Sequence, residues 1–224
     1  MKKKAIIISI KNYQLSTKEI SLLKNEKPWG LILFKRNIKS LTQVIRLIKK
    51  IRKLAKDTKF PIMIDEEGKT VSRLSKIIVQ KYSQKTFGDI YRFNPKVSLI
   101  IYKNYINNLT SLLKKIGINI NTVPVLDVIR KKTHKIIGNR SFSNDPRVVS
   151  KIGNICIDLF SKNKIGTIIK HIPGHGLSQL DSHFNLPIVY EKKKNLKKID
   201  FKVFEDCKTL FAMTAHVIYT DYDS

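Results

Sequence analysis

The feature that most constrains this chain is a regular alternation between short apolar runs and longer segments with helical periodicity. Six apolar runs of strand length span residues 4–10, 30–34, 61–65, 121–127, 166–171 and 210–219. Apolar residues recur every three or four positions at residues 17–25, 41–54, 95–116 and 146–162, which predicts helices there, and a short, polar helix is expected at 195–208. Residues 66–94 lack this period and are expected to be irregular. Strands this apolar suit a covered parallel sheet, so the alternation predicts an α/β fold.

Polar residues gather at the ends of several predicted strands. These residues are Asp65, Glu66 and Glu67 after the third strand, Asp127 at the end of the fourth, Lys170 and His171 at the end of the fifth, and His216 within the sixth. Contributions from many strands to one end of a sheet favour a (β/α)₈ TIM-type barrel. A doubly wound sheet is the alternative, but no glycine-rich nucleotide-binding motif follows any strand. We expect an incomplete barrel with about six of the eight βα units, forming a single domain over residues 1–224.

The formal net charge of +27 raises the question of nucleic-acid binding. The basic residues are 36 lysines and only 8 arginines, and they are spread along the whole chain. Base and phosphate recognition favours arginine, whose planar group bonds bidentately. We therefore expect no specific nucleic-acid partner, although weak, salt-sensitive adhesion to polyanions is expected, and a polyanion-binding protein stays an alternative.

Neither the amino terminus nor the cysteines indicate export. The apolar run after Lys2, Lys3 and Lys4 is only six residues long, which suits a first strand better than a secretory signal. No stretch is long enough for a membrane span. Cys156 and Cys207 lie in predicted helices and are expected to be reduced core residues. These features predict a cytoplasmic protein.

The segment Lys170-His171-Ile172-Pro173-Gly174-His175-Gly176, followed by Asp181-Ser182-His183, carries most of the chemical information. It places three histidines, a lysine and a carboxylate directly after a buried strand. In α/β proteins such loops at strand ends commonly hold the reacting groups. The glycines at 174 and 176 are expected to let the loop move.

These motifs, taken together, resemble one enzyme family. The segments that carry the resemblance are residues 30–36, 64–74, 138–142, 170–183 and 214–219. They look like the bacterial β-N-acetylglucosaminidases of glycoside hydrolase family 3, which act in peptidoglycan recycling. The resemblance implies a retaining β-N-acetylhexosaminidase without cofactor or metal, acting on N-acetylglucosamine-containing cell-wall fragments.

Residue roles follow from the resemblance by position. Asp181 and His183 match the acid/base dyad, in which His183 protonates the leaving oxygen and later deprotonates water. The positions that match the sugar-binding residues are Asp65, Arg73, Arg140, Lys170 and His171. The resemblance also implies a cis peptide bond between Lys170 and His171. From the residues alone, Asp127 and His175 are expected to be structural.

The chain departs from the family pattern at two places. Glu66, Lys69 and Thr70 stand where the family usually has glutamine, glycine and arginine, which puts the packing of that loop in question. The family nucleophile is an aspartate at the end of a seventh strand, and no matching motif is present; Asp221 and Asp223 come too early. We therefore expect a chain truncated before strand seven, whose own hydrolytic activity is doubtful.

Three interpretations remain beside the β-N-acetylglucosaminidase and the polyanion-binding protein. A degenerate, non-catalytic sugar-binding protein is the first, and a family 3 β-glucosidase is the second. A metal site is the third, because Asp65-Glu66-Glu67 or the histidines at 171, 175 and 183 could supply ligands. The glycine-rich loop suits a fixed ligand set poorly, so no metal is expected. The sequence makes no prediction about oligomeric state.

Overall fold

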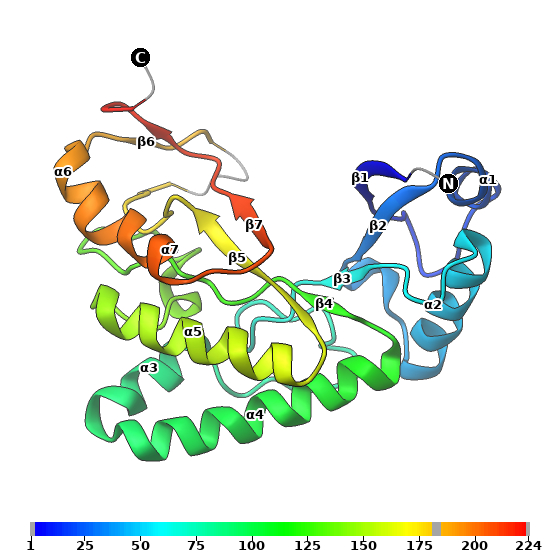
Figure 1. The fold of residues 1–224 in the computed structure, drawn as a ribbon, viewed down its shortest axis with the longest axis horizontal. Coiled ribbons are helices and arrows are strands. Elements are labelled where there is room, and N and C mark those ends of the chain that lie inside the picture. The colour runs from blue at the N-terminus through cyan, green and yellow to red at the C-terminus, as the bar shows by residue number, and fades with distance from the viewer. Residues whose placement is uncertain (1–2, 181–184, 223–224) are drawn as a thin grey trace.

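The computed structural model describes residues 3–180 and 185–222 and shows a curled, open sheet with helices on its outer side (Figure 1). Six parallel strands form this sheet in the order β1-β2-β3-β4-β5-β7. Their bounds are Lys4–Ile8, Pro28–Leu33, Ile62–Ile64, Ile120–Asn121, Gly166–Ile172 and Phe211–Thr214. The predicted α/β architecture, an incomplete barrel of six βα units, is confirmed.

The helices that cover the sheet begin at capped positions. Their bounds are Thr17–Asn25 for α1, Leu41–Ala55 for α2, Gln84–Phe93 for α3, Pro95–Ile116 for α4, Pro146–Lys162 for α5, Lys193–Leu196 for α6 and Lys202–Asp206 for α7, with a π-helical turn at Lys197–Phe201. The Ser40 side chain accepts a hydrogen bond from the Gln43 N–H, and Asn94 caps α4 in the same way. Such caps satisfy amide groups that the first helical turn leaves unpaired. Gly117 ends α4 in a left-handed conformation.

Two hydrophobic clusters lie on the two faces of the sheet. The larger one packs the strands against α1 to α5 and α7. The smaller one fills the inner face with Met63, Ile120 and Ile168, against which Trp29 and Met213 pack. The Trp29 ring lies 5.2 Å from the ring of Phe211 in β7. The inner face is therefore a packed core and not a channel.

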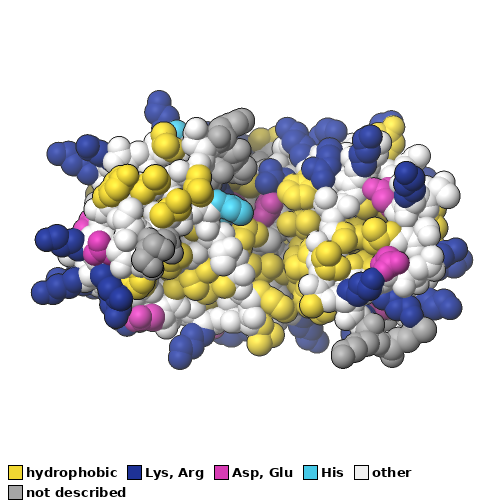
Figure 2. Space-filling view, turned by 90° about the horizontal axis from the view of Figure 1, so that it is seen from above, with side chains coloured by type: hydrophobic (Ala, Val, Ile, Leu, Met, Phe, Trp, Pro, Cys, Tyr) yellow, Lys and Arg dark blue, Asp and Glu magenta, His cyan; other side chains and the backbone are white. Residues whose placement is uncertain are grey.

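The sheet has two unpaired edges, at β1 and β7 (Figure 1). Ile6 and Ile7 of β1 are 53% and 45% exposed, so this strand is less covered than the central ones. Seen from above, apolar side chains line the middle of the molecule and basic ones are spread around its margin (Figure 2). Of the helices in the described residues, none has both the length and the apolar composition that crossing a membrane requires.

Three sequence predictions about local structure were wrong. Residues 84–93 are not irregular but form helix α3, which Ser83 caps. Phe87, Ile90 and Tyr91 recur three and four positions apart on one face, and this short apolar period was overlooked. The fourth strand is limited to Ile120–Asn121, since Pro124 has no N–H and cannot donate to a ladder. The sixth predicted strand is two strands: β7, and β8 at Ile218–Tyr219, which pairs with β6 at Ile188–Val189. His216 accordingly lies in the connection between them.

Candidate active site

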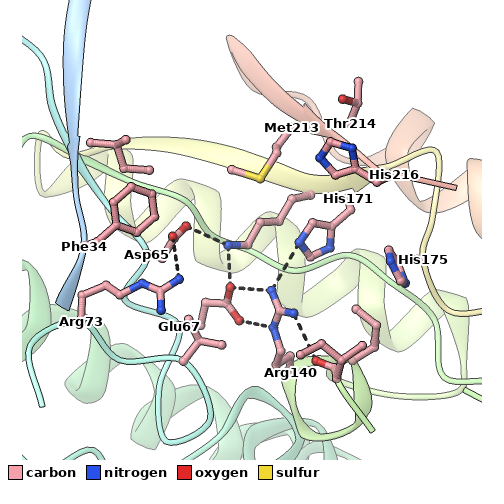
Figure 3. Close-up of a pocket in the computed structure, with 15 residues that line it drawn as sticks. Phe34, Asp65, Glu67, Arg73, Arg140, His171, His175, Met213, Thr214 and His216 are labelled. Carbon is pink, nitrogen blue, oxygen red and sulfur yellow. Dashed lines mark hydrogen bonds and ion pairs between the residues drawn. The ribbon is translucent and has the colours of Figure 1, made fainter. Parts of the chain in front are cut away.

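A pocket of about 390 Å³ lies at the carboxyl ends of the central strands (Figure 3). Asp65 and Glu67 follow β3, Lys170 and His171 belong to β5, and Arg140 ends a short 3₁₀ turn at Gly138–Arg140. Parallel strands bring these segments, which are far apart in sequence, to one end of the sheet. The pocket thus occupies the position where barrel folds keep their binding residues.

Lys170 is the centre of a buried ion network. Its side chain is only 2% exposed, and its Nζ lies 3.3 Å from Asp65 Oδ1 and 2.5 Å from Glu67 Oε1. Nζ also donates to Thr122 Oγ1 at 2.9 Å, and the Thr122 hydroxyl donates to Asp65. All three donors of the ammonium group therefore have partners, as burial of a charge requires.

Arg140 joins this network to His171. Its Nε donates to Glu67 Oε2 at 2.7 Å and its second terminal nitrogen donates to Oε1 at 2.9 Å, which is a two-point contact. The same terminal nitrogen lies 3.3 Å from His171 Nε2 (Figure 3). Arg73 completes the set, with a 3.0 Å ion pair to Asp65 and its guanidinium over the Phe34 ring.

Asp127 fixes the orientation of the His171 ring. The Asp127 Oδ2 lies 2.7 Å from His171 Nδ1, and Oδ1 accepts a 2.7 Å hydrogen bond from the His175 backbone N–H. Asp127 is completely buried, so the imidazole orientation is set by a carboxylate that solvent does not reach. The Lys170–His171 peptide is cis, which confirms the prediction from the resemblance.

The cations of the pocket keep its acids ionised. Burial raises the pKa of Asp65, but Lys170, Thr122 and Arg73 outweigh burial, and the net pKa lies well below its usual range. Glu67 follows the same pattern, with Lys170 and Arg140 lowering its pKa against burial. The pKa of Asp127 is also lowered, by His171 and by the His175 N–H, against the effect of its burial. The pocket therefore presents fixed, charged hydrogen-bonding groups at neutral pH.

Both glycines of the segment after β5 lie in closely packed surroundings. A Cβ on Gly176 would lie 1.9 Å from the Val128 carbonyl oxygen, so a side chain cannot fit there. The Gly176 carbonyl accepts a 2.5 Å hydrogen bond from Thr133 Oγ1, and the Gly174 carbonyl accepts one from the Tyr219 hydroxyl. These contacts show close packing at both glycines, and movement of the loop stays a prediction.

Glu66 supports the loop that carries Arg73. Its Oε2 accepts hydrogen bonds from the Arg73 and Leu74 backbone N–H groups at 2.9 and 3.0 Å, and Oε1 accepts one from Gln80 Nε2 at 2.8 Å. Burial raises the pKa of Glu66 despite these donors. The departure from the family residue at this position thus leaves the loop well held.

We expect Glu66→Gln to stabilise the protein relative to wild type at neutral pH. The folded protein binds the Glu66 proton more tightly than the unfolded chain does, so ionisation of Glu66 lowers the free energy of unfolding. This loss is complete above the raised pKa of the folded state and absent below the unfolded value of about 4.3. The stability difference between variant and wild type should therefore grow as the pH rises from 4 to 7. Urea unfolding at several pH values measures it, and a pH-independent difference would contradict the assigned ionisation.

The structure brings together all five residues that the resemblance marked for sugar binding. Asp181 and His183 lie outside the described residues, so the predicted dyad keeps its status as a prediction. Glu67 was missed as a site residue, although its place after β3 beside Asp65 was a signal. Thr122 and Phe34 carried no chemical signal that sequence reasoning could have used. Within the described residues, no group of three or more histidine, cysteine or carboxylate side chains is arranged to hold a metal ion.

Comparisons with known proteins agree with this geometry. Residues 3–224 match the glycosyl hydrolase family 3 N-terminal domain. The chain belongs to glycoside hydrolase family 3. A β-hexosaminidase from Haemophilus ducreyi is 34% identical over 223 residues, which cover 97% of this chain and 63% of that protein. One from Xanthomonas campestris pv. campestris is 28% identical and is covered to 65%.

Solved structures of the family have the same fold. The crystal structure of NagZ from Neisseria gonorrhoeae in complex with N-trifluoroacetyl-D-glucosamine aligns with a TM-score of 0.88 at 26% identity, covering 99% of this chain and 66% of that one. A family 3 β-N-acetylglucosaminidase from Paenibacillus aligns with a TM-score of 0.83 at 25% identity, covering 96% and 41%. The chain thus spans less than two thirds of the length of these relatives.

Proposed function

We propose that this chain forms the sugar-binding and acid/base part of a β-N-acetylhexosaminidase that removes terminal β-linked N-acetylglucosamine from muropeptides. The observation that carries the proposal is the buried network of Asp65, Glu67, Arg140 and Lys170. Its members are fixed by one another before any ligand binds, so little reorganisation is needed when sugar hydroxyls arrive. The Neisseria structure with an N-acylated glucosamine supports the same substrate class.

The proposed chemistry is retaining hydrolysis. His183, assisted by Asp181, would protonate the glycosidic oxygen and then deprotonate the attacking water. A nucleophilic carboxylate is also needed. Asp65 and Glu67 line the pocket, but both are engaged by cations, so neither suits attack on the sugar. We propose that the nucleophile is supplied from outside these 224 residues and that the assembled enzyme works in the cytoplasm.

Binding and turnover test the two parts of this proposal separately. Isothermal titration of the 224-residue chain with N-acetylglucosamine should show saturable binding that Arg140→Met weakens by about tenfold or more, because the two-point contact that shapes the pocket is lost. Arg147→Met, at an exposed ion pair, is the matched control and should bind normally. Absence of binding, or equal loss in both variants, would refute the sugar site.

Turnover of a chromogenic β-N-acetylglucosaminide is expected only when the missing carboxylate is provided. A chain extended through two further βα units should release the chromophore, and its His183→Ala variant should not. Hydrolysis by the 224-residue chain itself would contradict the placement of the nucleophile. Sugar binding by both forms without turnover by either would favour the non-catalytic sugar-binding alternative.

A further inference from the structure

A second cavity, of about 1080 Å³, lies at the opposite end of the sheet from the candidate active site. It is bounded by the starts of β1 and β2, near Lys3 and Pro28, and by the last turns of α1 and α2. All strands of the sheet are parallel, so the beginnings of β1 and β2 point away from the pocket at Lys170. The two cavities therefore do not share residues.

The charge of this cavity is strongly positive. Its lysines are Lys3, Lys24, Lys27, Lys50, Lys53 and Lys56, against the single carboxylate of Asp57. Asp57 forms a 2.5 Å ion pair with Lys3, and four of the other lysines, Lys24, Lys50, Lys53 and Lys56, form no ion pair within the described residues. The carboxyl ends of two helices contribute roughly half a negative charge each, so about three positive charges remain in excess.

Four of these lysines are available to a ligand. Lys24, Lys50, Lys53 and Lys56 are exposed, and none of them forms an ion pair with another residue in the described part of the chain.

The chemistry of the lining selects the ligand class. Ammonium groups bind phosphate as point charges, without the two-point geometry of arginine, and the lining has no arginine for bidentate reading of base edges. Phe60, the aromatic residue in the lining, is 1% exposed and offers no ring for a nucleic-acid base to stack on. The lysines surround a hollow and do not form an extended stripe. We propose that this cavity binds a small ligand that carries several phosphate groups.

Inorganic tripolyphosphate is the probe for this site. Titration of the wild-type chain at about 150 mM salt should show one saturable site, because the clustered lysines act together on one polyanion, whereas isolated surface lysines are screened at this salt. Lys50→Glu/Lys53→Glu should weaken binding by about tenfold or more. The matched control is Lys194→Glu/Lys198→Glu, which makes the same change in net charge on the distant α6 and π-helical turn (Figure 1) and should weaken binding less than about twofold. Circular dichroism establishes that both variants are folded.

Three outcomes would overturn the proposal. No saturable binding of tripolyphosphate at this salt concentration would remove the site. Equal weakening by the two lysine pairs would show that only total charge matters. A 20-nucleotide RNA that binds more tightly than tripolyphosphate, and whose binding the Lys50→Glu/Lys53→Glu variant abolishes, would assign the cavity to nucleic acid instead. None of these results depends on the proposed hydrolase activity.

Discussion

Replacing Lys170 with methionine is expected to lower the free energy of unfolding by about 3–5 kcal/mol, because the change leaves buried carboxylates without their cation. Asp65 and Glu67 both lie within 3.3 Å of Lys170 Nζ, and the side chains of all three are nearly inaccessible to solvent. Methionine is similar in length, so the loss reflects charge more than a cavity. N-acetylglucosamine binding should be lost as well.

Chemical unfolding at several pH values measures this effect and tests its origin. The wild-type carboxyls have lowered pKa values, so the stabilisation from Lys170 is present above about pH 4 and is lost as the pH falls through the lowered values. The difference between wild type and Lys170→Met should therefore shrink in acid. Lys202→Met, at an exposed pair with Asp206, is the control and should have no measurable effect. A small, pH-independent loss in Lys170→Met would refute the electrostatic account.

Gly176→Ala is expected to destabilise the protein by about 3 kcal/mol, since the new methyl group would collide with backbone and cannot rotate away. The atom it meets is the carbonyl oxygen of Val128, 1.9 Å from the ideal Cβ position. The displacement would reach the His175 N–H, which bonds Asp127, and through Asp127 the ring of His171. N-acetylglucosamine affinity should fall together with stability.

Gly138→Ala provides the comparison for Gly176→Ala. No atom lies within 4 Å of a Cβ built at Gly138, and its φ of 23° imposes only a backbone cost, of about 1 kcal/mol. Thermal unfolding and titration with N-acetylglucosamine compare the stability and the sugar affinity of the two variants. If Gly176→Ala lost no more stability than Gly138→Ala, the segment after β5 would be looser than its contacts indicate.

Much of the fold could be predicted because its signals are local. The periodic apolar residues of 41–54 and the proline after Asn94 are readable one helical turn at a time, and α2 and α4 begin where predicted. Helix α3 was overlooked because its apolar period, Phe87, Ile90 and Tyr91, spans little more than one turn. Its buried face also holds Gly88, which packs closely on the Phe142 backbone, and no local pattern could reveal that contact because the two residues are far apart in sequence.

The candidate active site also has residues that the sequence predicted and residues that it did not. The sequence by itself determined the α/β alternation and, through the resemblance, named Asp65, Arg73, Arg140, Lys170 and His171 as one group. Only the tertiary structure decided that Glu67 joins Lys170 to Arg140 and that Gly176 is a packing position. Both depend on atoms brought together from distant segments, and a tertiary contact of this kind produces no periodic pattern in the sequence. The physical reason is that ion pairing and steric fit act through space, whereas helix and strand patterns act along the sequence.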